Sequence, residues 1–137
     1  TFREIGASAD DRVVVITGAN GEFCSGADLS GGGVGGDRPQ HQLAAMRHVG
    51  NVALALHRLP QPVIAKVRGA ALAGGCGLAT VCDVIITSED AQFGYTETAI
   101  GFIPALVSLF LVRKIGEQHA RELLLSARRI KAEGRAP

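Results

Sequence analysis

The stretch Val63–Thr87 reads V-I-A-K-V-R-G-A-A-L-A-G-G-C-G-L-A-T-V-C-D-V-I-I-T, and it predicts the architecture of the chain. Its two ends, Val63–Val67 and Val84–Thr87, are short apolar runs typical of buried parallel strands. Between them, Arg68–Gly75 is rich in glycine and alanine and predicts a loop. The following residues, Cys76–Cys82, have the small side chains and apolar spacing of a short, tightly packed helix. Strand, loop, helix and strand in this order indicate an α/β fold.

The same alternation continues on both sides of this stretch. Arg12–Thr17 predicts another buried strand, and the glycine-rich run Ser30–Gly36 predicts a flexible surface loop. Apolar residues at steps of three and four predict a helix over Pro39–Leu59. Downstream, Ala105–Ile115 and Glu117–Ser126 predict two further helices. We therefore expect residues 1–137 to form the core of one α/β domain.

Composition excludes several classes of protein. Hydrophobic residues make up 47% and charged residues 20% of the chain, which is typical of a globular protein and too apolar for a disordered one. The net charge of +1 and the scattered basic residues favour neither a nucleic-acid nor a membrane partner. The three cysteines match no zinc or redox motif and are expected to be reduced and buried, and the four histidines show no metal-binding pattern. We expect a cytoplasmic protein without a bound metal.

Gly74 and Gly75 lie where the short helix is predicted to begin. The first N–H groups of a helix have no partner within it and carry the positive end of the helix dipole, so they attract negative charge. Glycine lets a ligand atom approach this backbone without meeting a Cβ. An oxyanion site is one interpretation; close packing of the helix on a strand is the other, and these glycines alone do not choose between them.

Three segments in a fixed order resemble the crotonase superfamily, the enoyl-CoA hydratase/isomerase family. They are Phe23–Leu29 (F-C-S-G-A-D-L), Gly69–Asp83 and Phe93–Glu97 (F-G-Y-T-E), and the resemblance runs from about Arg12 to Ile130. It implies a spiral of short ββα turns and an acyl-coenzyme A thioester as the ligand. Coenzyme A would enter as part of the substrate, so no separate cofactor is expected.

The resemblance also implies roles for individual residues. The backbone amides of Ala27 and Gly74 would hold the thioester oxygen while charge accumulates on it, and Glu97 would transfer the proton. Tyr95, two residues before Glu97, could face the acyl pocket, but a lone aromatic is more often part of the core, and we favour the core. The same segments would supply substrate-binding positions at Ser25, Gly26, Asp28, Gly75 and Gly77.

One position departs from the family pattern. Two-glutamate hydratases carry their first catalytic glutamate three residues after the oxyanion-hole glycine, and here that position is Gly77. A single carboxylate, Glu97, is therefore left for hydration, or for shuttling a proton as Δ3-Δ2 enoyl-CoA isomerases do. The segment Gly101–Ser108 resembles the methylglutaconyl-CoA hydratase branch and favours hydration. A chain that binds acyl-CoA without catalysis is the alternative of another class.

Family members are considerably longer than this chain, which implies that we see an incomplete fragment of the family domain. The first residues, Thr1–Ile5, look like the last turns of a helix whose beginning is absent. The family's N-terminal start and C-terminal helices are expected to be missing. The resemblance further implies a homotrimer or a dimer of trimers.

Overall fold

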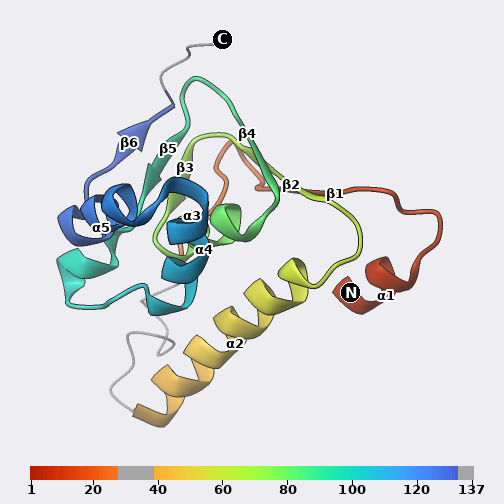
Figure 1. Ribbon diagram of the computed structural model, residues 1–137, viewed down its shortest axis with the longest axis horizontal. Helices are drawn as coiled ribbons and strands as arrows, with labels where there is room; N and C mark the ends of the chain where they lie inside the picture. Colours follow the sequence, from red (N-terminus) through yellow and green to blue (C-terminus); the bar gives the residue numbers. More distant parts are fainter. Residues whose placement is uncertain (28–38, 133–137) are drawn as a thin grey trace.

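The computed structural model describes residues 1–27 and 39–132, in which helices and strands alternate (Figure 1). In chain order the elements are α1 (Phe2–Ala7), β1 (Val14–Thr17), α2 (Pro39–His57), β2 (Val63–Val67), β3 (Ala70–Leu72), α3 (Gly74–Val81), β4 (Val84–Thr87), β5 (Gln92–Gly94), the 3-10 turn η1 (Thr96–Ile100), α4 (Ala105–Ile115), α5 (Glu117–Ser126) and β6 (Ile130–Lys131).

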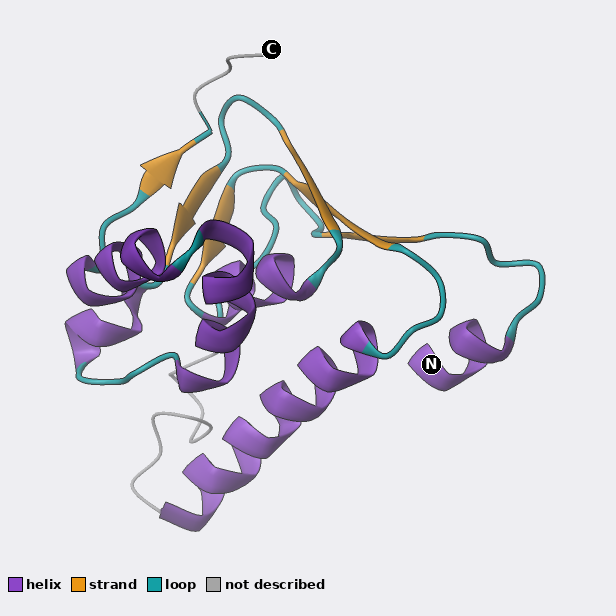
Figure 2. Cartoon of the chain, viewed as in Figure 1, coloured by secondary structure: helices purple, strands orange, loops and turns teal. Residues whose placement is uncertain are grey.

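The strands form two three-stranded sheets (Figure 2). In the first sheet, β2 lies between β1 and β4, and both pairings are parallel. In the second sheet, β5 pairs in parallel with β3 and antiparallel with β6. Because parallel neighbours need a crossover, helices α2 and α3 connect strands of the first sheet. The chain thus has the predicted α/β architecture.

The core lies on one face of the first sheet and beneath α3. Alternate residues of β2, namely Val63, Ala65 and Val67, are buried there together with Phe23 and other small apolar residues. A second cluster joins α3 to α4 and α5, and its buried members are Cys76, Tyr95, Val107, Leu111 and Ala120. Helix α3 belongs to both clusters, so its position is determined by packing on two sides.

Most of the predicted elements are confirmed. The strand Val63–Val67 and the helices Ala105–Ile115 and Glu117–Ser126 have the predicted bounds, and the long predicted helix is α2, Pro39–His57. The predicted Gly/Ala loop is wrong in part, because Ala70–Leu72 forms β3. A three-residue strand of small side chains has no pattern of its own and depends on pairing with β5.

The expected burial of two strands is also wrong. All four residues of β4 are exposed, and exposed residues alternate with half-buried ones along β1. The apolar side of α2 is exposed as well at Leu43, Met46, Val49 and Val52. In Figure 1 this helix extends away from the sheets. An apolar pattern indicates which face of a helix or strand favours burial. Whether another element covers that face depends on the tertiary structure.

Two expectations concern residues outside the described part. The predicted flexible loop at residues 30–36 and the candidate residue Asp28 both lie there. Among the described helices, none combines the length and the apolar character that crossing a membrane requires.

Candidate functional site

The two loops singled out in the sequence lie against each other because backbone hydrogen bonds join them. The Cys24 N–H donates to the Ala70 carbonyl at 3.0 Å, and the Leu72 N–H donates to the Cys24 carbonyl at 2.9 Å. This isolated bridge, in which Cys24 pairs in parallel with Ala71, extends the β3 edge of the second sheet. Residues 25–27 leave this edge beside the point where β3 ends and α3 begins.

Glycine is needed where the two loops meet. Gly26 adopts φ +101°, and a Cβ on it would lie 3.1 Å from the Ala73 Cβ and 3.4 Å from the Gly74 nitrogen. A Cβ on Gly75 would lie 2.0 Å from the Cys24 carbonyl oxygen, which is an impossible contact. The first loop therefore passes directly over the first turn of α3, with Ala27 following Gly26 along the chain.

Helix α3 begins with N–H groups that have no partner within the helix, and no described side chain caps it. Ala73 precedes it with φ 49° and ψ −126°, an unusual conformation for an L residue that costs about 1–3 kcal/mol. The first bond of the helix runs from the Gly77 N–H to the Ala73 carbonyl at 3.1 Å. The N–H groups of Gly74, Gly75 and Cys76 thus have no partner within the helix, and this end carries its positive dipole.

Glu97 lies in η1, where its side chain is half-buried. Its carbonyl accepts from the Phe102 N–H at 3.0 Å, which closes the turn around it. The carboxyl Oε2 is buried and has no hydrogen-bond partner among the described residues. Burial in these surroundings raises the pKa of Glu97, because the charged form loses hydration. A carboxyl group with a raised pKa holds a proton more readily than an exposed one, which suits a group that both accepts and donates a proton.

The wall beside Glu97 is formed by Cys76 and Tyr95, which both belong to the second core cluster. Tyr95 precedes Glu97 by two residues along the chain, and the charge of Glu97 acts on both Cys76 and Tyr95. Burial raises the pKa of the Cys76 thiol to about 11, and it also raises the pKa of Tyr95. Both groups are therefore neutral at physiological pH, and Cys76 is not a thiolate nucleophile.

Gly77 is buried, and the space where its side chain would extend is filled. A Cβ on Gly77 would lie 2.6 Å from the Val107 Cγ1 and 3.2 Å from the Val107 Cβ and Cγ2. Val107 is itself a buried residue of α4. The space next to Gly77, where the resemblance predicted that two-glutamate hydratases carry a carboxylate, is thus filled here by the isopropyl group of Val107.

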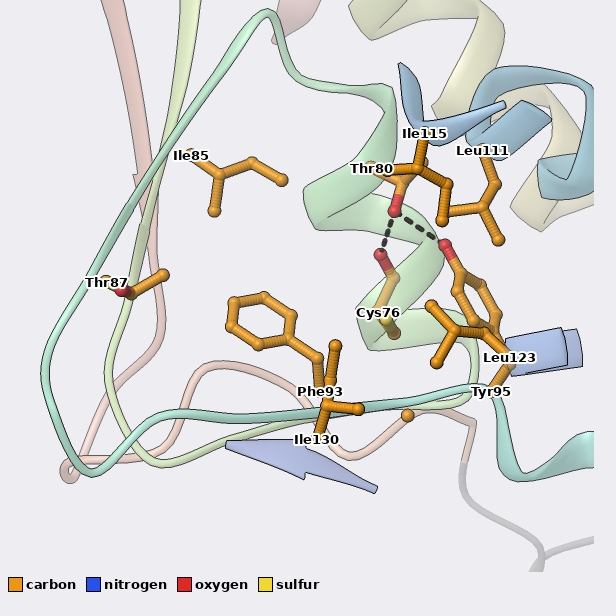
Figure 3. A pocket seen from close by; sticks show the side chains of 11 residues that line it. Cys76, Thr80, Ile85, Thr87, Phe93, Tyr95, Leu111, Ile115, Leu123 and Ile130 are labelled. Carbon is orange, nitrogen blue, oxygen red and sulfur yellow. Dashed lines mark hydrogen bonds between the residues drawn. The ribbon is translucent and has the colours of Figure 1, made fainter. Parts of the chain in front are cut away.

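An apolar cavity of about 300 Å³ lies on the core side of this wall (Figure 3). Its lining comes from both sheets and from α3, α4 and α5: Cys76, Thr80, Ile85, Thr87, Phe93, Gly94, Tyr95, Leu111, Ile115, Leu123 and Ile130. It shares Cys76 and Tyr95 with the Glu97 surroundings, whereas Ala27, Gly74 and Glu97 do not line it. We therefore identify the candidate site from the loop contact and Glu97 rather than from this cavity.

The predicted site residues fall into two groups in the structure. Gly26, Gly74 and Gly75 meet at the loop contact. Ala27 follows Gly26 along the chain, and both Ser25 and Ala27 are exposed. Gly77 lies deeper, under Val107, and Glu97 belongs to the neighbouring turn. Cys76 and Cys82 are buried as expected and Cys24 is half-buried, all three as free thiols.

Sequence reasoning missed Thr80 and Val107, and for Tyr95 it favoured a core position over one facing the acyl pocket. A threonine inside an apolar helix was the one available signal, because its hydroxyl needs a partner when buried. For metals, no group of three or more His, Cys, Asp or Glu side chains within residues 1–27 and 39–132 has the arrangement of a binding site.

Comparisons with known proteins point to one family. The sequence model of the family described as enoyl-CoA hydratase/isomerase matches residues 1–136. A Thermus thermophilus protein provisionally named an enoyl-CoA hydratase is 43% identical over 88% of this chain and 48% of its own. The enoyl-CoA hydratase ACTT6 of Alternaria alternata is 36% identical over 96% of this chain and 43% of its own.

Solved structures show the same fold. The crystal structure of an enoyl-CoA hydratase from Bacillus anthracis superimposes with a TM-score of 0.90 at 38% identity. The match covers 96% of the present chain and 51% of that chain. The chain spans about half the length of the curated relatives and solved structures that it matches.

Proposed function

Because this chain belongs to the enoyl-CoA hydratase/isomerase family, we propose that it binds an acyl-CoA thioester and polarises its carbonyl with two backbone amides. The amides are those of Ala27 and Gly74. The observation that carries this proposal is the glycine-dependent contact of the Gly26 loop with the first turn of α3. Two donors aimed at one developing oxyanion are worth about 3–4 kcal/mol each in the reaction barrier.

Glu97 is the proton-transfer group in this proposal. Its raised pKa and its buried Oε2, which has no partner among the described residues, support the role, since a desolvated carboxyl group holds a proton more readily than an exposed one. Ser25, Gly26, Gly75 and Gly77 contribute small or backbone contacts to the ligand, and we extend this role to Asp28.

Hydration of an enoyl-CoA is the reaction we favour. Glu97 takes a proton from water, the hydroxide adds to C3, and the electron pair moves onto the thioester oxygen. Glu97 then returns the proton to C2 as the carbonyl reforms. The names of the relatives and the resemblance of Gly101–Ser108 to the methylglutaconyl-CoA hydratase branch support this assignment. With glycine at position 77, the water is held by backbone groups and Glu97.

Isomerisation is the second candidate, and the packing of Val107 over Gly77 supports it. An isopropyl group here keeps water and a second carboxylate away. A single glutamate is sufficient for the isomerase reaction, in which Glu97 removes a proton from C2 of a 3-enoyl-CoA. The dienolate charge rests on the thioester oxygen, and the same carboxyl group delivers the proton to C4.

We further propose that the protein is cytoplasmic and assembles as a homotrimer or a dimer of trimers. The family resemblance supports both proposals. The exposed apolar side chains of α4, such as Leu109, provide a surface suited to contact between copies. Sedimentation of the purified chain over a range of concentrations tests the assembly.

The deciding experiment measures turnover of crotonyl-CoA, 3-methylglutaconyl-CoA and a 3-enoyl-CoA by the purified chain and by Glu97→Gln. We expect Glu97→Gln to lower kcat by about 10²–10⁴-fold, as loss of a general acid or base does. Glu117→Gln, at an exposed position of α5, is the control and should keep the wild-type rate.

Retention of the rate by Glu97→Gln refutes the role of Glu97. Tight acyl-CoA binding without turnover of any of the three substrates supports a non-catalytic binding protein instead. Absence of binding in equilibrium dialysis refutes the oxyanion site itself.

A further inference from the structure

The Tyr95 hydroxyl takes part in a buried chain of hydrogen bonds (Figure 3). Tyr95 is 2% exposed and Thr80 is 5% exposed. The Tyr95 hydroxyl oxygen lies 2.6 Å from Thr80 Oγ1, and Thr80 Oγ1 lies 2.9 Å from the Cys76 carbonyl oxygen. The phenol of a residue next to the Glu97 turn is therefore connected to Thr80 in the last turn of α3.

The direction of these bonds follows from counting protons. A threonine hydroxyl has a single hydrogen. The Cys76 carbonyl can only accept, so Thr80 donates to it. Tyr95 must then donate its hydroxyl hydrogen to Thr80 Oγ1. The raised pKa of Tyr95 keeps this hydrogen in place at physiological pH.

Tyr95 also begins the turn that carries Glu97. It is the N-cap residue of η1, and Glu97 is the second residue of that turn. On the other side of Tyr95, the Gly94 carbonyl accepts from the Ala73 N–H at 2.8 Å. The backbone leading to Glu97 is thus attached to the start of α3 through Gly94 and to its last turn through Tyr95.

The Glu97 carboxyl group needs this attachment. Its Oε2 has no hydrogen-bond partner among the described residues, so no side-chain contact orients it from that oxygen. A 3-10 turn of five residues has weak internal hydrogen bonds and depends on its surroundings. The turn itself packs against α5, and the residues that lead into it, Gly94 and Tyr95, are attached to α3. The location of the carboxyl group relative to the Gly74 amide therefore depends on this attachment to α3 as well as on the packing against α5.

We propose that the Tyr95–Thr80 hydrogen bond positions Glu97 against the first turn of α3, which makes Tyr95 and Thr80 positioning residues for proton transfer. This inference rests on the proposed function, because it assigns to Glu97 the same proton-transfer role. It requires no contact of either residue with substrate. The Tyr95 ring packs in the core, while its hydroxyl group holds the η1 turn in position through the bond to Thr80.

Kinetics of hydroxyl deletions provide the first test. Tyr95→Phe and Thr80→Val should each lower kcat by about tenfold to a hundredfold, since a displacement of about 1 Å has effects of this size. The value of KM should change less than about twofold, because binding through the backbone amides is retained. Thr80→Ser keeps the hydroxyl and should restore nearly the wild-type kcat.

The matched control is Ser88→Ala. It deletes a half-buried hydroxyl that donates to the Val67 carbonyl, in the turn between β4 and β5 and away from the proposed site. This variant should keep kcat. If Tyr95→Phe fails to fold, Thr80→Val decides the same question.

Amide hydrogen exchange provides a second test that needs no turnover. The Gly101 and Phe102 amides close the turn, the latter by donating to the Glu97 carbonyl. In Tyr95→Phe their exchange should accelerate by about fivefold to tenfold, the ratio expected from loss of one ordinary hydrogen bond. The same amides should exchange at the wild-type rate in Ser88→Ala.

The two tests separate this inference from the proposed function. Unchanged kcat or unchanged exchange in Tyr95→Phe overturns the positioning role, even if the wild-type chain is an active hydratase. A chain without turnover refutes the proposed function, whereas faster exchange in Tyr95→Phe would still show that the hydroxyl positions the Glu97 turn.

Discussion

At the scale of single residues, the candidate site depends on one carboxyl group and on the side chains that surround it. Sequence resemblance was sufficient to select Glu97. Its half-buried environment, with Oε2 unpartnered among the described residues, is a consequence of the packing of η1. The occupation of the Gly77 space by Val107 is likewise a contact between residues 30 positions apart, which no local pattern contains.

Glu97→Gln should stabilise the protein at neutral pH. Burial raises the pKa of Glu97 above its ordinary value of 4.5, so the folded state binds this proton more tightly than the unfolded chain. The stability contributed by the protonated group is fully present below pH 4.5 and is lost as pH rises through the folded-state pKa. Glutamine carries no such titration. In urea unfolding between pH 4 and 8, the free energy of unfolding of Glu97→Gln should therefore exceed that of the wild type by an amount that increases with pH.

The control for this prediction is Glu117→Gln, because Glu117 is exposed on α5. The difference in free energy of unfolding between Glu117→Gln and the wild type should not increase with pH in the same way. If the difference in free energy of unfolding between Glu97→Gln and the wild type is constant across the pH range, burial does not desolvate the Glu97 carboxyl group as described.

Gly77→Glu should fail to create a two-carboxylate site unless Val107 is changed too. The new Cβ would lie 2.6 Å from Val107 Cγ1, and overpacking of this kind costs about 1–3 kcal/mol. We expect Gly77→Glu alone to lower the free energy of unfolding by at least this amount. Gly77→Glu combined with Val107→Gly should recover part of the loss and raise hydration of crotonyl-CoA above that of Val107→Gly alone.

Thermal unfolding and crotonyl-CoA hydration of the three variants check this prediction. If Gly77→Glu alone is as stable as the wild type, the isopropyl group does not fill the site as described. If the double variant is stable but no faster than Val107→Gly, a carboxylate at position 77 does not assist hydration in this chain.

At the scale of elements, α3 and the two loops were largely predictable from the sequence, whereas the short strands were not. A run such as Val63–Val67 has an intrinsic preference for strand, and Gly74 and Gly75 indicate where a helix begins. The strands Ala70–Leu72 and Gln92–Gly94 contain too few residues for a period of two to emerge, and they exist because they pair with each other.

Gly75→Ala should disrupt the contact between these elements. Its Cβ would lie 2.0 Å from the Cys24 carbonyl oxygen, and that oxygen is part of a backbone bridge and cannot turn aside. We expect the variant to be destabilised by about 3 kcal/mol or to lose the bridge. Gly74→Ala is the matched comparison, because its Cβ would lie 3.9 Å from the nearest atom, the Gly26 Cα.

Denaturant unfolding of the two variants measures the effect. Gly74→Ala should differ from the wild type by less than about 1 kcal/mol in stability. Equal stability of Gly75→Ala and Gly74→Ala would show that the two loops are not in the close contact described here.

At the scale of the whole molecule, one face of the first sheet is apolar and exposed. Val15 and Ile86 are each 54% exposed, and Val84 is 48% exposed. The strand register places Val15 beside Ile64 and Ile64 beside Val84, so these side chains share one face. An exposed patch of this kind is typical of a surface that binds another protein surface.

The double variant Val15→Thr with Ile86→Thr should therefore reduce self-association of the chain. Threonine retains the branched shape that suits a strand but adds a hydroxyl, so the patch loses apolar area. We expect the apparent dissociation constant to rise by about tenfold or more. Sedimentation equilibrium measures it, and Leu125→Thr, outside the sheet, is the control. A wild-type chain that remains monomeric at all concentrations contradicts the prediction.

The sequence by itself determined the α/β alternation, the family and the candidate residues, because strand-forming runs, glycine-dependent turns and helix starts are local properties of the chain. The tertiary structure decided which of those residues meet. It brought Gly26 onto Gly74, placed Val107 over Gly77 and joined Tyr95 to Thr80 beside Glu97. The physical reason is that close packing and hydrogen bonding between distant segments depend on distances in space, which periodicity and spacing along one chain do not contain.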